Sequence, residues 1–127
     1  MKFCTVINCM DGRVQLPVIR YLKNYFGAEY VDSITEAGAN LILSEQKDNR
    51  IIESILKKID ISIHKHASGA IAVSGHYDCA ANPSDKDTQI EHIRKSVKFL
   101  RTRYKDMEIA GLWVDENWEV HQVSPEE

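Results

Sequence analysis

Two cysteines and one histidine in this chain have the types and positions needed to bind a transition metal. Cys9 comes directly after the apolar run 2–8, and His76 and Cys79 come just after a second apolar run, 69–74. Thiolate sulfur and imidazole nitrogen are ligands that zinc prefers, and three protein ligands leave a fourth coordination position for water. Although His-x-x-Cys alone is a common spacing, its place after a strand pattern predicts a Cys2His zinc site.

A carboxylate and a guanidinium follow the first cysteine closely. Asp11 and Arg13 come two and four residues after Cys9. Asp11 could contact or occupy the fourth position on the metal, and the planar fork of Arg13 could hold Asp11 in place. The alternative interpretation is a surface ion pair that caps the following helix. The presence of His76 and Cys79 favours the catalytic interpretation, in which Asp11 and Arg13 assist the metal.

The elements that must position these residues alternate between strand and helix patterns. Strands are expected at 2–8, 29–35, 69–74, 109–114 and, after a hairpin connection, 118–123. Helices are expected at 16–26, at 51–59 with an end left open as far as residue 66, and after a cap at Ser84 or Asp85. This alternation predicts a single three-layer α/β domain over residues 1–127, with a Rossmann-like, mainly parallel sheet of order 2-1-3-4 and a short fifth edge strand.

The expected strand order brings the candidate ligands to one place. In open parallel sheets, ligands bind beyond the carboxyl ends of the strands, where the strand order reverses. Here that point lies between the first and third strands, which directly precede Cys9 and His76. We therefore expect residues 67 positions apart in the sequence to meet in space. The segment 37–40, Ala-Gly-Ala-Asn, follows the second strand and is expected to form a turn at the same edge.

Composition excludes several other classes of protein. The formal net charge of −3 and a sequence pI near 5.9 provide no attraction to nucleic acid or anionic membranes. No apolar stretch approaches the roughly 20 residues that span a bilayer, and the chain begins with a strand pattern, so we expect a cytoplasmic protein without a membrane partner. Three cysteines in unlike settings do not indicate a disulfide framework, and Cys4 is expected in the core.

Taken together, these motifs resemble the motif set of the β-class carbonic anhydrases. The residues that carry the resemblance are Cys9, Asp11, Arg13, the Ala37-Gly38 turn, Gly75, His76 and Cys79. The resemblance implies a parallel α/β fold, zinc held by the two cysteines and the histidine, and an Asp-Arg pair beside the metal. It also implies a homodimer or higher homo-oligomer that catalyses the reversible hydration of carbon dioxide to bicarbonate by zinc-bound hydroxide.

The chain departs from that motif set at several positions. Gly12 stands where the family usually has serine, Ala80 stands where it has glycine, and Asp78 adds a carboxylate beside the second cysteine. An extra residue, Ala39, separates Gly38 from Asn40 and leaves the role of Asn40 open.

Other functions remain alternatives at this point. They are a non-catalytic zinc-binding or regulatory module of the same fold and a hydrolase of carbon disulfide or carbonyl sulfide. A metal-free thiol enzyme would leave His76 and Cys79 unexplained. Cysteine-dependent phosphatases are excluded, because their loop places five residues between cysteine and arginine where this chain has three. The remaining histidines, His64, His66, His92 and His121, are assigned no catalytic role.

Overall fold

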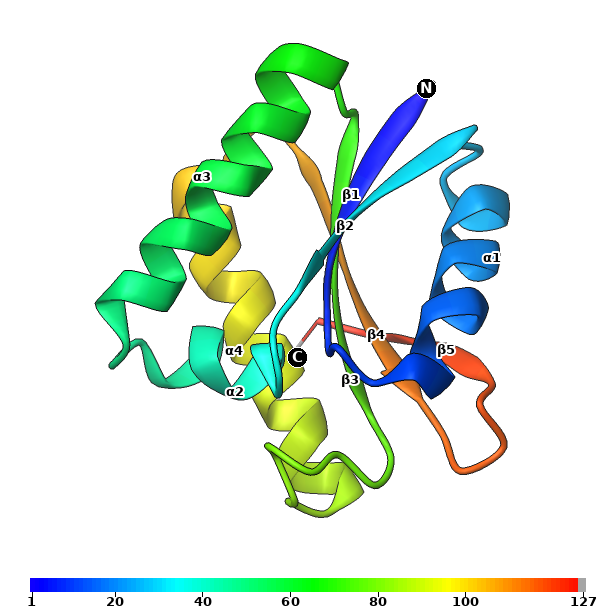
Figure 1. Ribbon diagram of the computed structural model, residues 1–127, viewed down its shortest axis with the longest axis vertical. Coiled ribbons are helices and arrows are strands. Elements are labelled where there is room, and N and C mark those ends of the chain that lie inside the picture. Colours follow the sequence, from blue (N-terminus) through cyan, green and yellow to red (C-terminus); the bar gives the residue numbers. More distant parts are fainter. Residues whose placement is uncertain (126–127) are drawn as a thin grey trace.

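The computed structural model describes residues 1–125, and a five-stranded sheet forms its centre (Figure 1). The strands are β1 (Phe3–Asn8), β2 (Tyr30–Thr35), β3 (Ala70–His76), β4 (Glu108–Val114) and β5 (Val120–Val123). Their order is β2-β1-β3-β4-β5; the first four are parallel, and β5 pairs antiparallel with β4. The predicted α/β fold and strand order are confirmed. Glu126 and Glu127, the end of the predicted domain, lie outside the described residues.

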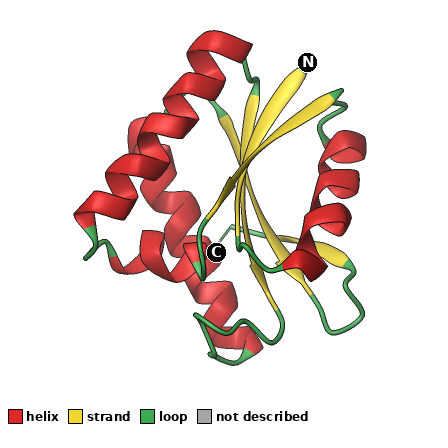
Figure 2. Cartoon of the chain, in the orientation of Figure 1, coloured by secondary structure: helices red, strands yellow, loops and turns green. Residues whose placement is uncertain are grey.

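Helices cover both faces of this sheet and complete three layers (Figure 2). The helix α1 (Gln15–Tyr25), preceded by the 3-10 turn η1 (Gly12–Val14), lies on one face. The other face carries α2 (Ala39–Glu45), α3 (Asn49–His66) and α4 (Lys86–Arg103). Within the described part of the chain, no helix is both long enough and apolar enough to cross a membrane.

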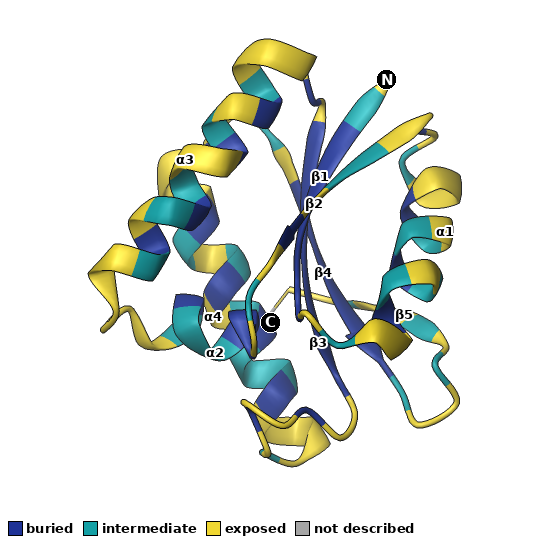
Figure 3. Ribbon diagram, in the orientation of Figure 1, coloured by how far each residue is buried: buried dark blue, intermediate teal, exposed yellow. Residues whose placement is uncertain are grey.

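The core consists of two apolar clusters, one on each face of the sheet. Every residue of β3 is buried, and so are five of the six residues of β1 (Figure 3). Val6 and Ala72 contribute to the cluster beneath α1, whereas Ile7 and Ile71 contribute to the cluster beneath α3 and α4. Central strands of a parallel sheet are apolar on both faces because helices cover both. This burial fixes the positions of the two strands that end at the candidate site.

Three details differ from the sequence-based expectation. The helix α2 was not expected, because seven residues are too few for a helical period to stand out from a turn. The strand β3 runs two residues further than expected, so His76 is its last residue rather than part of the following loop. The strand β5 begins at Val120 instead of residue 118, because Trp118 has a left-handed backbone with φ 60° and ends the preceding turn.

Candidate metal centre

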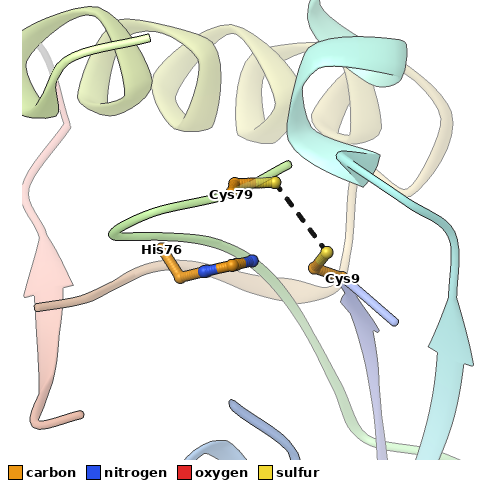
Figure 4. Close-up of side chains that lie close together, drawn as sticks. All are labelled: Cys9, His76 and Cys79. Atoms are coloured by element: carbon orange, nitrogen blue, oxygen red, sulfur yellow. Dashed lines mark hydrogen bonds between the residues drawn. The ribbon is translucent and has the colours of Figure 1, made fainter. Parts of the chain in front are cut away.

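The side chains of Cys9, His76 and Cys79 come together at the carboxyl ends of β1 and β3 (Figure 4). Their ligand atoms all lie within 4.8 Å of one another. The pairing of Ile7 with Val73 brings the end of β1 beside the end of β3, so Cys9 lies close to His76. All three side chains are buried, with exposed fractions of 6%, 1% and 3%. The structure thus brings together three residues that the sequence separates by up to 70 positions.

The separation of the two sulfur atoms fits a shared metal ion. The Sγ atoms of Cys9 and Cys79 lie 3.9 Å apart, and neither cysteine is in a disulfide. Two thiolates bound about 2.3 Å from one tetrahedral zinc lie about 3.8 Å apart. A disulfide would require about 2.05 Å. Cys4 does not join them: burial raises the pKa of its thiol to about 11, which keeps it protonated in the core.

The imidazole of His76 presents an unpartnered nitrogen to this pair. Its Nδ1 lies 2.7 Å from the carbonyl oxygen of Tyr77, and because a carbonyl only accepts, Nδ1 must carry the proton. The lone pair is therefore on Nε2, which is buried and has no hydrogen-bond partner among the described residues. A buried polar atom without a partner is costly, and a metal ion would satisfy it. The donor set, two thiols and one imidazole nitrogen, fits zinc.

The two thiols are strongly coupled. Their mutual hydrogen bond, which places one proton between the two sulfur atoms, is the main cause that lowers the pKa of the Cys9 thiol and raises the pKa of the Cys79 thiol. The neighbouring imidazole of His76 and, to a smaller extent, the backbone N–H groups of Gly38 and Asp11 also lower the pKa of Cys9, against the effect of burial. A divalent cation would take the place of the shared proton and bind two thiolates.

Gly38 belongs to the turn that the sequence analysis expected at this edge. Its φ of 63° lies in the left-handed region, and it is the N-cap of α2. A Cβ at this position would lie 3.1 Å from backbone atoms of Ala81. Glycine therefore allows the turn to pack against the segment after Cys79 while its N–H acts on Cys9.

Asp11 and Arg13 form a two-point ion pair beside the metal centre. The guanidinium donates from Nη2 to Oδ2 of Asp11 over 2.7 Å and from Nε to Oδ1 over 3.1 Å. These hydrogen bonds are the main cause that lowers the pKa of Asp11 to about 2. Asp11 is not in the group of ligand atoms within 4.8 Å of one another. The carboxylate of Asp11 is therefore not one of the candidate ligands, which are Cys9, His76 and Cys79.

Arg13 also contacts two segments that are distant in the sequence, at Asp78 and at Trp118. It donates to Oδ2 of Asp78 over 3.2 Å and to the backbone carbonyl of Asp78 over 3.1 Å. Its guanidinium carbon lies 4.5 Å from the ring centroid of Trp118 in the β4–β5 turn. The extra carboxylate of Asp78 is thus paired with Arg13 rather than directed at the thiols.

A second group of residues of types that can bind metal lies in the β4–β5 hairpin. It consists of Asp115, Glu119 and His121, and it is mostly exposed. Oδ1 of Asp115 accepts from the backbone N–H groups of Asn117 and Glu119, and Oδ2 contacts Nε2 of His121 over 2.6 Å. These contacts close the turn, so the group is explained as a structural feature of the hairpin.

Sequence reasoning missed a group of buried amides behind the metal centre. Asn40, Asn82 and Gln89 are each at most 2% exposed, and they are hydrogen-bonded to one another. The available signal was Gln89, which falls in phase with the apolar positions Ile93 and Leu100 of α4. A polar residue on the buried stripe of a helix indicates an internal partner.

The comparisons with known proteins agree with this fold. A family model described as "putative carbonic anhydrase" matches residues 1–124. The β-carbonic anhydrase CafA of Aspergillus fumigatus matches with a TM-score of 0.68 at 12% identity, over 99% of this chain and 76% of that one. One of two tetrameric β-carbonic anhydrases from Sordaria macrospora matches with a TM-score of 0.64 at 12% identity, over 97% and 80%.

A third solved structure, the β-carbonic anhydrase CcaA, matches with a TM-score of 0.57 at 14% identity, over 98% of this chain and 85% of that one. The comparison with curated proteins gave no match. At such identities, structural likeness shows the fold alone. The family model spans nearly the whole chain and shows the family.

Proposed function

The chain belongs to the carbonic anhydrase family of that model, as a divergent member with the β-carbonic anhydrase fold, and on this premise we propose a zinc-dependent activity for it. Zinc is held by Cys9, His76 and Cys79, and the reaction is the reversible hydration of carbon dioxide to bicarbonate. The observation that carries the proposal is the buried, unpartnered Nε2 of His76 beside two sulfur atoms 3.9 Å apart.

The metal, when bound, would supply Lewis-acid activation of a water molecule at the fourth position. The protein then has to orient that water and leave its lone pair free for the carbon of the substrate. Two thiolates offset the charge of the metal ion, so orientation by neighbouring residues matters more here than at a site with neutral ligands.

Asp11 is the residue suited to this orienting role. Its pKa of about 2 keeps it ionised at neutral pH, so it accepts hydrogen bonds and does not donate them. Oδ1 already accepts from both N and Nε of Arg13, which occupies its two lone pairs. Among residues 1–125, Oδ2 accepts only from Nη2 of Arg13, which leaves it one lone pair. Asp11 can therefore accept the O–H of the attacking water at Oδ2, while Arg13 fixes the direction of that lone pair.

Metal analysis and kinetics test the proposal in sequence. We expect one zinc per chain in the wild-type protein, and loss of that zinc in Cys9→Ala. Cys4→Ala is the matched control, because Cys4 is buried on β1, the strand that ends just before Cys9, but is not in the ligand group. Stopped-flow assays of the zinc-loaded protein should show carbon dioxide hydration that rises with pH.

Two results would contradict this proposal in different ways. A wild-type protein without stoichiometric zinc, unchanged by Cys9→Ala, would remove the metal centre. Full zinc occupancy with hydration at the buffer rate, even at alkaline pH, would remove the activity. The second result would favour a non-catalytic zinc-binding module of the same fold.

A further inference from the structure

Three side-chain amides form a buried cluster on the α2 and α4 side of β3, behind the metal centre. Asn40 lies on α2, Asn82 lies in the loop before α4, and Gln89 lies on α4. We refer to Asn40, Asn82 and Gln89 as the amide cluster. Their exposed fractions are 2%, 0% and 1%. Buried amides are tolerated only where their hydrogen bonds are satisfied, so the hydrogen-bond partners of each amide show which segments the cluster holds in place.

The hydrogen bonds of Gln89 reach both ends of the loop that carries Cys79. Its Nε2 donates to the backbone carbonyl of His76 over 2.8 Å and to the backbone carbonyl of Asn82 over 3.0 Å. Both acceptors are carbonyls, so the NH2 group of Gln89 must face them and its orientation is not arbitrary. One side chain thus fixes the first and last residues of the segment 76–82, which supplies two of the three candidate ligands.

The orientation of Gln89 determines that of the other amides. Its Oε1 accepts from Nδ2 of Asn40 over 3.1 Å, so Oδ1 of Asn40 faces Nδ2 of Asn82 over 3.3 Å. Nδ2 of Asn82 also donates to Nδ1 of His92 over 3.0 Å. Ser84 donates to Oδ1 of Asn82 over 2.9 Å. Each amide has one orientation that satisfies all its partners, which makes the cluster rigid.

The cluster also connects the segments that surround the two sulfur atoms. Cys79 lies between the two backbone carbonyls that Gln89 holds, those of His76 and Asn82. Asn40 follows Gly38 by two residues, and Gly38 packs so closely on the same segment that a Cβ there would lie 3.1 Å from backbone atoms of Ala81. The space between β3 and the cluster is full, because a Cβ on Gly75 would lie 2.5 Å from Nδ2 of Asn40.

We propose that Gln89 is a positioning residue for the metal centre: its two N–H groups hold the segment 76–82 in the metal-binding geometry before the metal arrives. The inference rests on the zinc site of the proposed function but not on turnover. Partners outside the ligand shell typically change metal affinity by about 10–100-fold when they are removed. We expect an effect of that size here, because Gln89 contacts the backbone of the ligand-bearing segment itself.

The test uses Gln89→Met, which keeps the length of the side chain and removes both donors. Ile93→Val is the matched control, one turn further along the same buried face of α4 and outside the amide cluster. Zinc affinity is measured by competition with a chelator, and the geometry of the site by the absorption of the Co2+-substituted protein. We expect a zinc dissociation constant about 10–100-fold higher in Gln89→Met, with weaker thiolate-to-cobalt bands, and a value within twofold of wild type in Ile93→Val. Equal affinities in the two variants would overturn the proposal.

Hydrogen exchange in the metal-free wild type gives a second measurement that does not depend on a variant folding. The proposal requires both side-chain N–H groups of Gln89, which donate to the carbonyls of His76 and Asn82, to be protected before zinc is added. Free exchange of these groups, followed by protection only on zinc binding, would contradict it. A chain that binds zinc with a preformed loop but does not hydrate carbon dioxide would refute the proposed function and leave this inference supported.

Discussion

A methyl group added at Gly75 is a sharp test of the packing behind the metal centre. The Cβ of Gly75→Ala would lie 2.5 Å from Nδ2 of Asn40, 2.7 Å from Oε1 of Gln89 and 3.0 Å from Cδ1 of Ile93. Ordinary van der Waals contact begins near 3.4 Å, so the first two atoms are too close by about 0.9 and 0.7 Å. Both atoms belong to buried, hydrogen-bonded amides and cannot move independently. Overpacking of this kind costs roughly 1–3 kcal/mol of unfolding free energy.

Urea denaturation of the chelator-treated protein measures this cost without any contribution from bound metal. With an m-value of about 1–3 kcal/mol per molar urea, the loss should lower the midpoint by roughly 1 M. Gly12→Ala is the control, because a Cβ there meets nothing within 4 Å. Alanine restricts the unfolded chain more than glycine does, so this variant should be more stable than wild type by about 0.4–1 kcal/mol. Zinc affinity should fall in Gly75→Ala only. If the two variants have the same midpoint, the cluster is not close-packed against β3.

Two further predictions concern Arg13 and His92. In Arg13→Lys the two-point contact with Asp11 is lost, so the pKa of the Asp11 carboxyl should rise from about 2 toward its ordinary 3.8. Carboxyl 13C NMR measures this pKa, and an unchanged value would contradict the role given to the guanidinium. Carbon dioxide hydration should slow by about 10–100-fold in the same variant. Burial lowers the pKa of His92 below its ordinary 6.5, so the unfolded chain binds this proton more tightly. Stability should be full above pH 6.5 and should fall as the pH drops through that value, and His92→Phe should remove this part of the slope in urea midpoints between pH 7.5 and 5.5.

The sheet and the meeting of the ligands could be predicted because they follow from local signals. The runs that became β1 and β3 are mostly apolar, which is typical of strands buried on both faces, and a candidate ligand stands at or just after the end of each strand. Short right-handed connections limit the possible strand orders to a few. In the predicted order 2-1-3-4 the first and third strands are neighbours, so Cys9 and His76 are expected to end side by side.

The support behind the ligands could not be predicted in the same way. A buried amide is recognised only by its partners, and two of the partners of Gln89 are the backbone carbonyl of His76, 13 residues earlier, and the amide of Asn40, 49 residues earlier. Nothing in the sequence relates these three positions. The same holds for Asp78, which the sequence left as an unexplained carboxylate and which the fold brings to Arg13, 65 residues away.

The departures from the family motif fall around the metal centre rather than in it. Gly12, Asp78 and Ala80 are exposed, and none supplies a ligand atom or belongs to the amide cluster. A side chain at position 12 would enter open space, so the missing hydroxyl leaves no gap in the packing. Of these three, Asp78 contacts a residue of the proposed site, namely Arg13. Arg13 donates once to the carboxylate of Asp78, over 3.2 Å, and once to its backbone carbonyl, over 3.1 Å, whereas it donates to both carboxylate oxygens of Asp11, with a shortest distance of 2.7 Å. Since Asp11 has the stronger hold on the guanidinium, the geometry needed to orient a water at Oδ2 is retained despite the extra carboxylate.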